Sequence, residues 1–151
     1  MLSQLLTPER ISRNICAKDW EEAVRQAGQL LVDTQCVEHR YVDEMVNISR
    51  EAGPYIVIVP GVALAHARPS DGAKELSMSL ITLNTPVNFG NEDNDPVRVV
   101  FALAALDNSH HLNALRELVR FINEPRNIDK LCRSENNKEV VELIQAYDTS
   151  C

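Results

Sequence analysis

Residues 55–69, with the sequence YIVIVPGVALAHARP, decide the expected fold and contain the most informative motif of the chain. The apolar run Tyr55–Val59 predicts a buried strand, and the Pro-Gly pair at 60–61 ends it. We expect the remaining residues to form a loop that carries one histidine, His66, and one arginine, Arg68, between two prolines. Neutral imidazole can attack phosphorus and guanidinium can hold oxyanions, so this loop is a candidate site for phosphate chemistry.

The bulk composition indicates one globular domain that spans residues 1–151. The chain is 44% hydrophobic and 25% charged, which is typical of a folded protein. A net charge of -7 argues against binding to nucleic acid or to an anionic membrane surface, because both need clustered Lys and Arg. Residues 1–10 lack the features of a signal peptide, and no segment is apolar over the length of a membrane span. We therefore expect a cytoplasmic protein that does not insert into the membrane.

Helix and strand patterns alternate along the chain. Apolar residues at helical spacing predict helices over 19–31, 38–50, 109–122 and 125–132, and a last helix from about residue 136. Strand patterns cover 11–15, 55–59, 76–83 and 97–106, and a short edge strand is expected at 87–89. This alternation predicts an α/β domain with a mixed, mostly parallel central sheet flanked by helices on both faces.

A second histidine, His111, follows the strand expected at 97–106 and lies at the start of a helix capped near Ser109. If the ends of strands 55–59 and 97–106 lie side by side, His66 and His111 meet in one cleft. The free N–H groups of the helix start would favour a bound anion there and would keep His111 neutral. Ser109 is therefore a candidate phosphate contact.

The other candidate sites are weaker. His110 is expected to point away from the cleft, and His39, between charged neighbours in a predicted helix, is expected to be solvated. The acidic loop at 92–95 lacks the length, the central glycine and the closing glutamate of an EF-hand. The four cysteines have neither CxxC nor metal-ligand spacing, and no GxxxxGK[ST] motif occurs. We expect reduced thiols, no metal and no cofactor.

Residues 60–115 resemble the enzyme IIA domain of the bacterial phosphoenolpyruvate-dependent sugar phosphotransferase system, of the mannitol/fructose type and closest to its ascorbate-specific branch. The resemblance extends over nearly the whole chain. Its branch-specific features are Gly53-Pro54-Tyr55, Pro60-Gly61, Arg68-Pro69 and Asn94-Asp95-Pro96-Val97.

The resemblance implies a role for each matching residue. His66 matches the histidine that accepts the phosphoryl group, and His111 matches a second histidine that supports it. Arg50 matches an arginine that lines the site in the mannitol branch, while the closeness of Arg68 to His66 suggests a second phosphate contact. The implied partners are the histidine-containing phosphocarrier protein as donor, a cysteine of enzyme IIB as acceptor and, indirectly, the membrane transporter of ascorbate or a related sugar.

One departure from the family pattern leaves alternatives open. The family usually reads Pro-His-Gly at the active histidine, whereas this chain has Ala65-His66-Ala67, which removes the glycine's access to positive φ. One alternative is a regulatory enzyme IIA-like paralogue that acts through protein binding. Another is an unrelated histidine enzyme such as a phosphatase, although the Arg-His-Gly pattern of one such class is missing. An apolar docking patch for the partner proteins is expected at Val62, Leu64 and Ala65.

Overall fold

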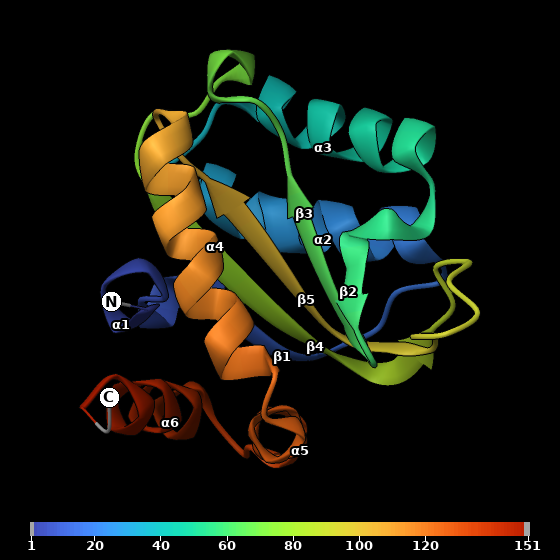
Figure 1. Ribbon diagram of the computed structural model, residues 1–151, viewed down its shortest axis with the longest axis vertical. Coiled ribbons are helices and arrows are strands. Elements are labelled where there is room, and N and C mark those ends of the chain that lie inside the picture. The colour runs from blue at the N-terminus through green and yellow to red at the C-terminus, as the bar shows by residue number, and fades with distance from the viewer. Residues whose placement is uncertain (1, 150–151) are drawn as a thin grey trace.

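A five-stranded sheet with helices on both faces forms the core of the protein (Figure 1). The structure is a computed structural model that describes residues 2–149. The strands are β1 (Ile11–Ile15), β2 (Val57–Val59), β3 (Val62–His66), β4 (Ser77–Val87) and β5 (Val97–Ala104). The helices are α1 (Leu2–Leu5), α2 (Trp20–Asp33), α3 (His39–Ala52), α4 (Asn108–Ile122), α5 (Pro125–Arg133) and α6 (Asn137–Thr149). Short 3-10 turns cover η1 (Pro8–Arg10), η2 (Pro54–Ile56) and η3 (Pro69–Asp71).

The strand order across the sheet is β1-β4-β5-β3-β2, and the sheet is mixed, as expected. β1 with β4 and β3 with β5 pair in parallel, whereas β4 with β5 and β2 with β3 pair antiparallel. Both antiparallel pairs are joined by short connections along the chain. α2 and α3 cover one face, and α1, α4, α5 and α6 cover the other (Figure 1).

The region around His66 differs most from the prediction. The strand expected at 55–59 begins only at Val57, because Pro54–Ile56 forms a 3-10 turn, and β2 is a short edge strand. The loop expected after Pro60-Gly61 is instead β3, a central strand that pairs with β5 on one side and β2 on the other. Its alternation explains this: Ala63 and Ala65 pack against α2 and α3, while Val62 and Leu64 face the cluster that includes α4.

The other elements follow the prediction with local changes. β4 runs without interruption across residues 84–86, which separate the strands expected at 76–83 and 87–89, and it ends at the first residue of the second of these. The Asp19 carboxylate caps α2 by accepting from the N–H of Glu22 (2.9 Å), and the Asn136 side chain accepts from the N–H of Glu139 (2.9 Å) before α6. No helix among residues 2–149 is long and apolar enough to cross a membrane.

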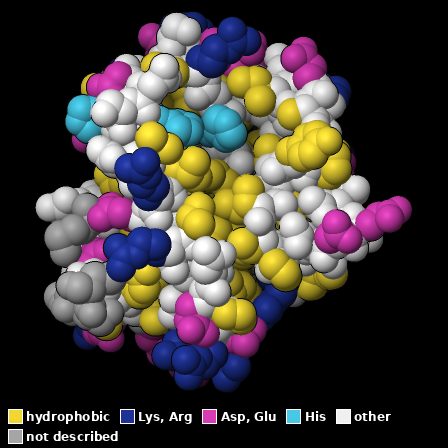
Figure 2. All heavy atoms as spheres, in the orientation of Figure 1, with side chains coloured by type: hydrophobic (Ala, Val, Ile, Leu, Met, Phe, Trp, Pro, Cys, Tyr) yellow, Lys and Arg dark blue, Asp and Glu magenta, His cyan; other side chains and the backbone are white. Residues whose placement is uncertain are grey.

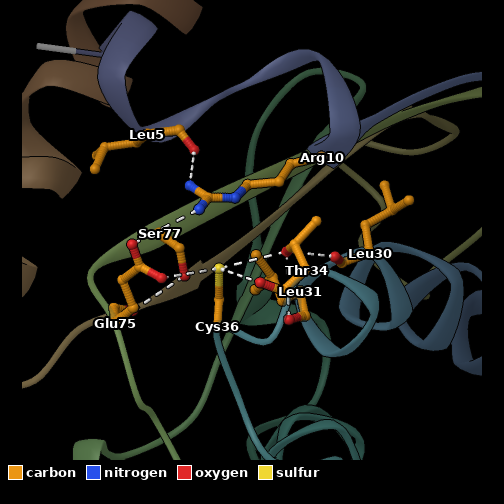
Figure 3. Close-up of polar contacts among 8 residues, drawn as sticks. All are labelled: Leu5, Arg10, Leu30, Leu31, Thr34, Cys36, Glu75 and Ser77. Carbon is orange, nitrogen blue, oxygen red and sulfur yellow. Dashed lines mark hydrogen bonds and ion pairs between the residues drawn. The ribbon is translucent and has the colours of Figure 1, made fainter.

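A polar cluster anchors the segment between β3 and β4 (Figure 3). The Arg10 guanidinium donates to the carbonyl of Leu5 (2.9 Å) and lies 3.9 Å from the carboxylate of Glu75. The other oxygen of Glu75 accepts from the buried thiol of Cys36 (3.6 Å), and the Cys36 carbonyl accepts from the N–H of Lys74 (2.9 Å). Thus the chain that follows His66 is tied to both the N-terminal segment and the α2–α3 connection.

The described cysteines are free thiols, as expected. Cys16 is exposed, Cys36 is buried and Cys132 is half-buried. Cys151 lies outside the described residues.

Candidate functional site

Two histidines meet where β3 and β5 end. His66 is the last residue of β3, and its Cα partner on β5 is Leu103. β5 ends one residue later, and the chain turns into α4, which carries His111 in its first turn. The ring centroids of His66 and His111 are 5.3 Å apart, with an interplanar angle of 66°. The predicted meeting of the two histidines is therefore confirmed, but its premise is wrong. β2 runs opposite to β3 and β5, so the end of the strand expected at 55–59 does not lie beside the end of β5. The pair forms because β3 and β5 are parallel and end together.

The pKa of His66 is lowered from its ordinary value, first by burial and then by the charge of His111. The backbone carbonyl of Leu64 acts in the opposite direction and raises this pKa. The Nδ1 atom of His66 is buried and makes no hydrogen bond of ordinary geometry with a described residue. Since Nδ1 is enclosed, Nε2 is the ring nitrogen through which His66 can react with a group from outside.

The pKa of His111 is also lowered, by burial. This agrees with the neutral form expected from the sequence, but the expected cause is wrong. The start of α4 is not free, because the Asp107 carboxylate accepts from the N–H of His110 (2.7 Å) and thereby caps the helix. The ring of His110 contacts the same carboxylate (2.7 Å). Ser109 is exposed in this first turn, close in sequence to His111.

Arg68 lies on the same side of the chain as His66. The intervening residue, Ala67, is buried in the cluster beneath α2 and α3. Arg68 has extended backbone angles (φ -77, ψ 150), and side chains alternate along extended backbone, so Arg68 returns to the side of His66. Its side chain is exposed, and a guanidinium in this position can approach a group bound at His66.

Arg50, the other predicted phosphate contact, lies at the opposite end of α3 from the turn that contacts Ala67. The helical rise separates that turn from Arg50 by about 14 Å along the axis. The Arg50 guanidinium pairs with Glu21 and lies 5.8 Å from the Trp20 ring centroid. The structure therefore does not bring Arg50 to the histidine pair. The direction of α3 places Arg50 at the far end of the helix, and the number of residues between Arg50 and His66 does not reveal this direction.

His39 is solvated, as expected: its side chain is exposed and lies 3.7 Å from the carboxylate of Asp43. Among the residues that the structure describes, no three His, Cys, Asp or Glu side chains lie close enough together to hold a metal ion. In the acidic loop, the Asp95 carboxylate accepts three backbone N–H groups, those of Phe89, Gly90 and Asn91 (2.8–3.0 Å). This carboxylate therefore organises the connection between β4 and β5.

The apolar surface near the histidines differs from the predicted docking patch. Val62, Leu64 and Ala65 are buried, because β3 is covered on both faces. The described large apolar side chains that are exposed are Tyr55, Leu106 and Leu112, and two of these lie close to the pair in the chain. Leu106 follows β5, and Leu112 follows His111. Figure 2 shows histidine side chains at the surface beside a hollow with much apolar surface.

Comparisons with known proteins agree with this geometry. Residues 4–147 match the family model described as "Phosphoenolpyruvate-dependent sugar phosphotransferase system, EIIA 2". The chain is 38% identical to the ascorbate-specific PTS system EIIA component of Escherichia coli (strain K12) over 129 residues, which are 85% of this chain and 84% of that protein.

Solved structures of similar proteins share the fold. The mannitol-specific cryptic phosphotransferase enzyme IIA of Escherichia coli is 31% identical, with a TM-score of 0.85 over 96% of this chain and 98% of that chain. Enzyme IIA in the Escherichia coli complex of enzyme IIAMtl and phosphorylated enzyme IIBMtl is 26% identical, with a TM-score of 0.82 over 94% of this chain and 99% of that chain.

Proposed function

The chain belongs to the EIIA 2 family of the phosphoenolpyruvate-dependent sugar phosphotransferase system, and we propose that it is a phosphoryl carrier whose acceptor is His66. The observation that carries the proposal is the His66–His111 pair, with ring centroids 5.3 Å apart at the end of a central strand. Both rings have a lowered pKa, so both are neutral at neutral pH. A neutral ring with one enclosed nitrogen has a single nucleophilic atom to offer, Nε2 of His66.

In the first transfer, Nε2 of His66 attacks the phosphorus of the phosphohistidine on the histidine-containing phosphocarrier protein. A new N–P bond forms at His66 as the N–P bond of the donor breaks, and the donor imidazole recovers its electron pair. Because the transition state is loose and metaphosphate-like, positioning and charge stabilisation supply most of the catalysis. His111 lies close enough to donate to a phosphoryl oxygen, and Arg68 can offer its charge from the same side.

In the second transfer, a cysteine thiolate of enzyme IIB attacks the phosphorus on His66. An S–P bond forms as the N–P bond breaks, and His66 returns to its neutral state. The relation to the IIA protein in the mannitol IIA–IIB complex supports this choice of partner. Leu106 and Leu112 offer exposed apolar contact area next to the pair, which suits the small interfaces of transient complexes.

The sugar is ascorbate or a related compound, by relation to the ascorbate-specific components. The carrier itself need not touch the sugar, since the phosphoryl group reaches it through enzyme IIB and the membrane transporter. The proposed place of action is the cytoplasm. No step in this scheme requires a metal or a nucleotide.

The replacement of Pro-His-Gly by Ala65-His66-Ala67 no longer favours the regulatory alternative. Among the described residues, the non-glycine residues with positive φ are Asn14 and Gln35, so Ala67 does not need the conformation that glycine permits. Ala65 is an ordinary buried residue of β3. The replaced residues flank His66 without strain, and they are compatible with phosphoryl transfer.

Intact mass spectrometry tests the proposal after incubation with phosphoenolpyruvate, enzyme I and the phosphocarrier protein. We expect a gain of one acid-labile phosphoryl group that His66→Ala abolishes. His39→Ala is the matched control, because His39 is an exposed histidine that lies near Asp43 of the same helix, and this variant should be phosphorylated normally. A phosphoryl group that persists in His66→Ala would refute the assignment.

A further inference from the structure

The side chain of Tyr41, in the first turn of α3, is fully buried beneath the end of β3. Its hydroxyl accepts a hydrogen bond from the N–H of Ala67 (3.1 Å) and donates to the carbonyl of Leu103 (2.8 Å). The carbonyl of Ala67 is a second acceptor at 3.2 Å. The hydroxyl therefore bonds simultaneously to two different strand ends.

These two backbone positions frame the acceptor histidine. Ala67 directly follows His66, and Leu103 is the Cα partner of His66 across the β3–β5 ladder. The ladder ends at this pair, so the N–H of Ala67 has no strand partner beyond it. The tyrosine oxygen connects the two strands where their regular pairing stops. It thereby replaces the next backbone hydrogen bond that a longer pair of strands would make.

The same turn of α3 holds the chain farther on. The guanidinium of Arg40 donates to the carbonyl of Ser70 (3.2 Å), and the N–H of Glu38 donates to the carbonyl of Gly72 (2.8 Å). Both of these contacts involve exposed side chains or loop backbone, whereas the Tyr41 contacts are buried. Water can replace an exposed hydrogen bond but cannot reach a buried one, so Tyr41 is the contact whose loss matters most.

We propose that the Tyr41 hydroxyl is a positioning group for His66: it ties the residue after the imidazole to the neighbouring strand β5 and so sets the distance and angle between His66 and His111. The inference rests on the proposed role of His66 as phosphoryl acceptor. Burial raises the pKa of Tyr41 to about 12, so the hydroxyl keeps its proton and can donate and accept together at physiological pH.

The test is Tyr41→Phe, which removes one oxygen and leaves the ring that fills the core. Without the bridge, the end of β3 loosens, and a displacement of about 1 Å at a reacting atom can slow transfer by up to about 100-fold. We expect the rate of phosphorylation by the phosphocarrier protein to fall by about 10- to 100-fold while the final yield remains one phosphoryl group. In the same variant, the pKa of His66, followed by NMR of the ring, should rise toward its ordinary value because burial and contact with His111 both weaken.

The matched control is Asn127→Ala in α5, which also removes a buried side chain-to-backbone hydrogen bond, to the carbonyl of Phe121 (2.8 Å). This variant should lose stability but retain the wild-type rate and the wild-type pKa of His66. A loss of rate in Asn127→Ala equal to that in Tyr41→Phe would assign the effect to general destabilisation and overturn the proposal. Wild-type rate and His66 pKa in Tyr41→Phe would overturn it as well.

Hydrogen exchange in the wild-type protein gives a test that needs no variant. The amide of Ala67 should be strongly protected although it lies beyond the end of β3, and rapid exchange of this amide would contradict the proposal. If wild-type protein accepts no phosphoryl group on His66, the proposed function fails. The exchange of Ala67 and the pKa of His66 still report whether Tyr41 positions the ring.

Discussion

Acidification should destabilise the protein through the histidine pair. Burial lowers the pKa of both His66 and His111 in the folded state, with the charge of His111 as a second cause for His66. In the unfolded chain both rings have an ordinary pKa near 6.5. As the pH falls below about 6.5, the unfolded state therefore binds protons that the folded state does not yet bind. The contribution of the pair is fully present above this pH and is lost progressively as the pH falls toward the folded-state values.

The magnitude follows from the number of protons that differ between the two states. A ring that is protonated only in the unfolded state changes the free energy of unfolding by at most about 1.4 kcal/mol per pH unit. His66 is the more enclosed ring and should approach this limit, whereas the more exposed His111 should contribute less because solvent screens it. The free energy of unfolding should therefore change with pH more steeply than the exposed His111 alone would cause. The slope should stay below about 2.7 kcal/mol per pH unit, the limit for two rings.

Urea-induced unfolding, followed by circular dichroism between about pH 7 and pH 5, measures this slope. The double variant His66→Gln/His111→Gln should lose most of it, whereas His39→Gln should retain it. Carboxylates with a lowered pKa, such as Asp107, act below this window and do not interfere. An identical pH slope in wild type and double variant would refute the claim that the folded state holds these rings neutral.

Three further predictions concern the site. His111→Gln should still accept a phosphoryl group but transfer it on the order of 100-fold more slowly, as measured by rapid-quench kinetics with enzyme IIB, and a wild-type rate would remove His111 from the mechanism. Arg68→Gln should slow phosphoryl acceptance only about fivefold, because the side chain is exposed and solvent screens its charge. Added salt should reduce the difference in rate between variant and wild type. Equal rates at low salt would exclude a phosphate contact. Leu106→Ser with Leu112→Ser should raise KM for enzyme IIB about fivefold or more at nearly unchanged kcat. Tyr55→Ser, which changes an exposed side chain of the turn before edge strand β2, is the comparison, and equal effects from both would argue against a contact specific to Leu106 and Leu112.

The sequence predicted the class of fold and most of the elements, because their signals are local. The apolar period of α2, its Asp19 cap and the long apolar run of β5 each specify one element without reference to the rest of the chain. β3 was missed because VALA is short and follows a proline and a glycine, and these features are equally typical of a loop. Its assignment as a strand depends on two neighbours, β5 and β2, that only the folded sheet provides.

The candidate site was predictable in part for the same reason. His66 and His111 were expected to meet because each follows a predicted strand, but the strand before His66 was taken to be 55–59, whereas β3 is the strand that ends beside β5. The role of Asp107 as the cap of α4 was missed in favour of Ser109, although Asp is as good a cap and stands directly after the strand. The separation of Arg50 from the pair depends on the direction of α3, and the bridge from Tyr41 depends on which face of that helix meets β3. Neither the direction of the helix nor the face that meets β3 can be predicted from the local sequence.

The central claim is that His66 accepts the phosphoryl group through Nε2, because Nδ1 is enclosed. NMR of the phosphorylated protein with 15N-labelled histidine distinguishes the two ring nitrogens and identifies the residue. We predict a single phosphohistidine, with the N–P bond at Nε2 of His66. The 15N resonance of Nδ1 should show no N–P bond at that atom. Phosphorylation at Nδ1 of this ring, or on any other residue, would contradict the account.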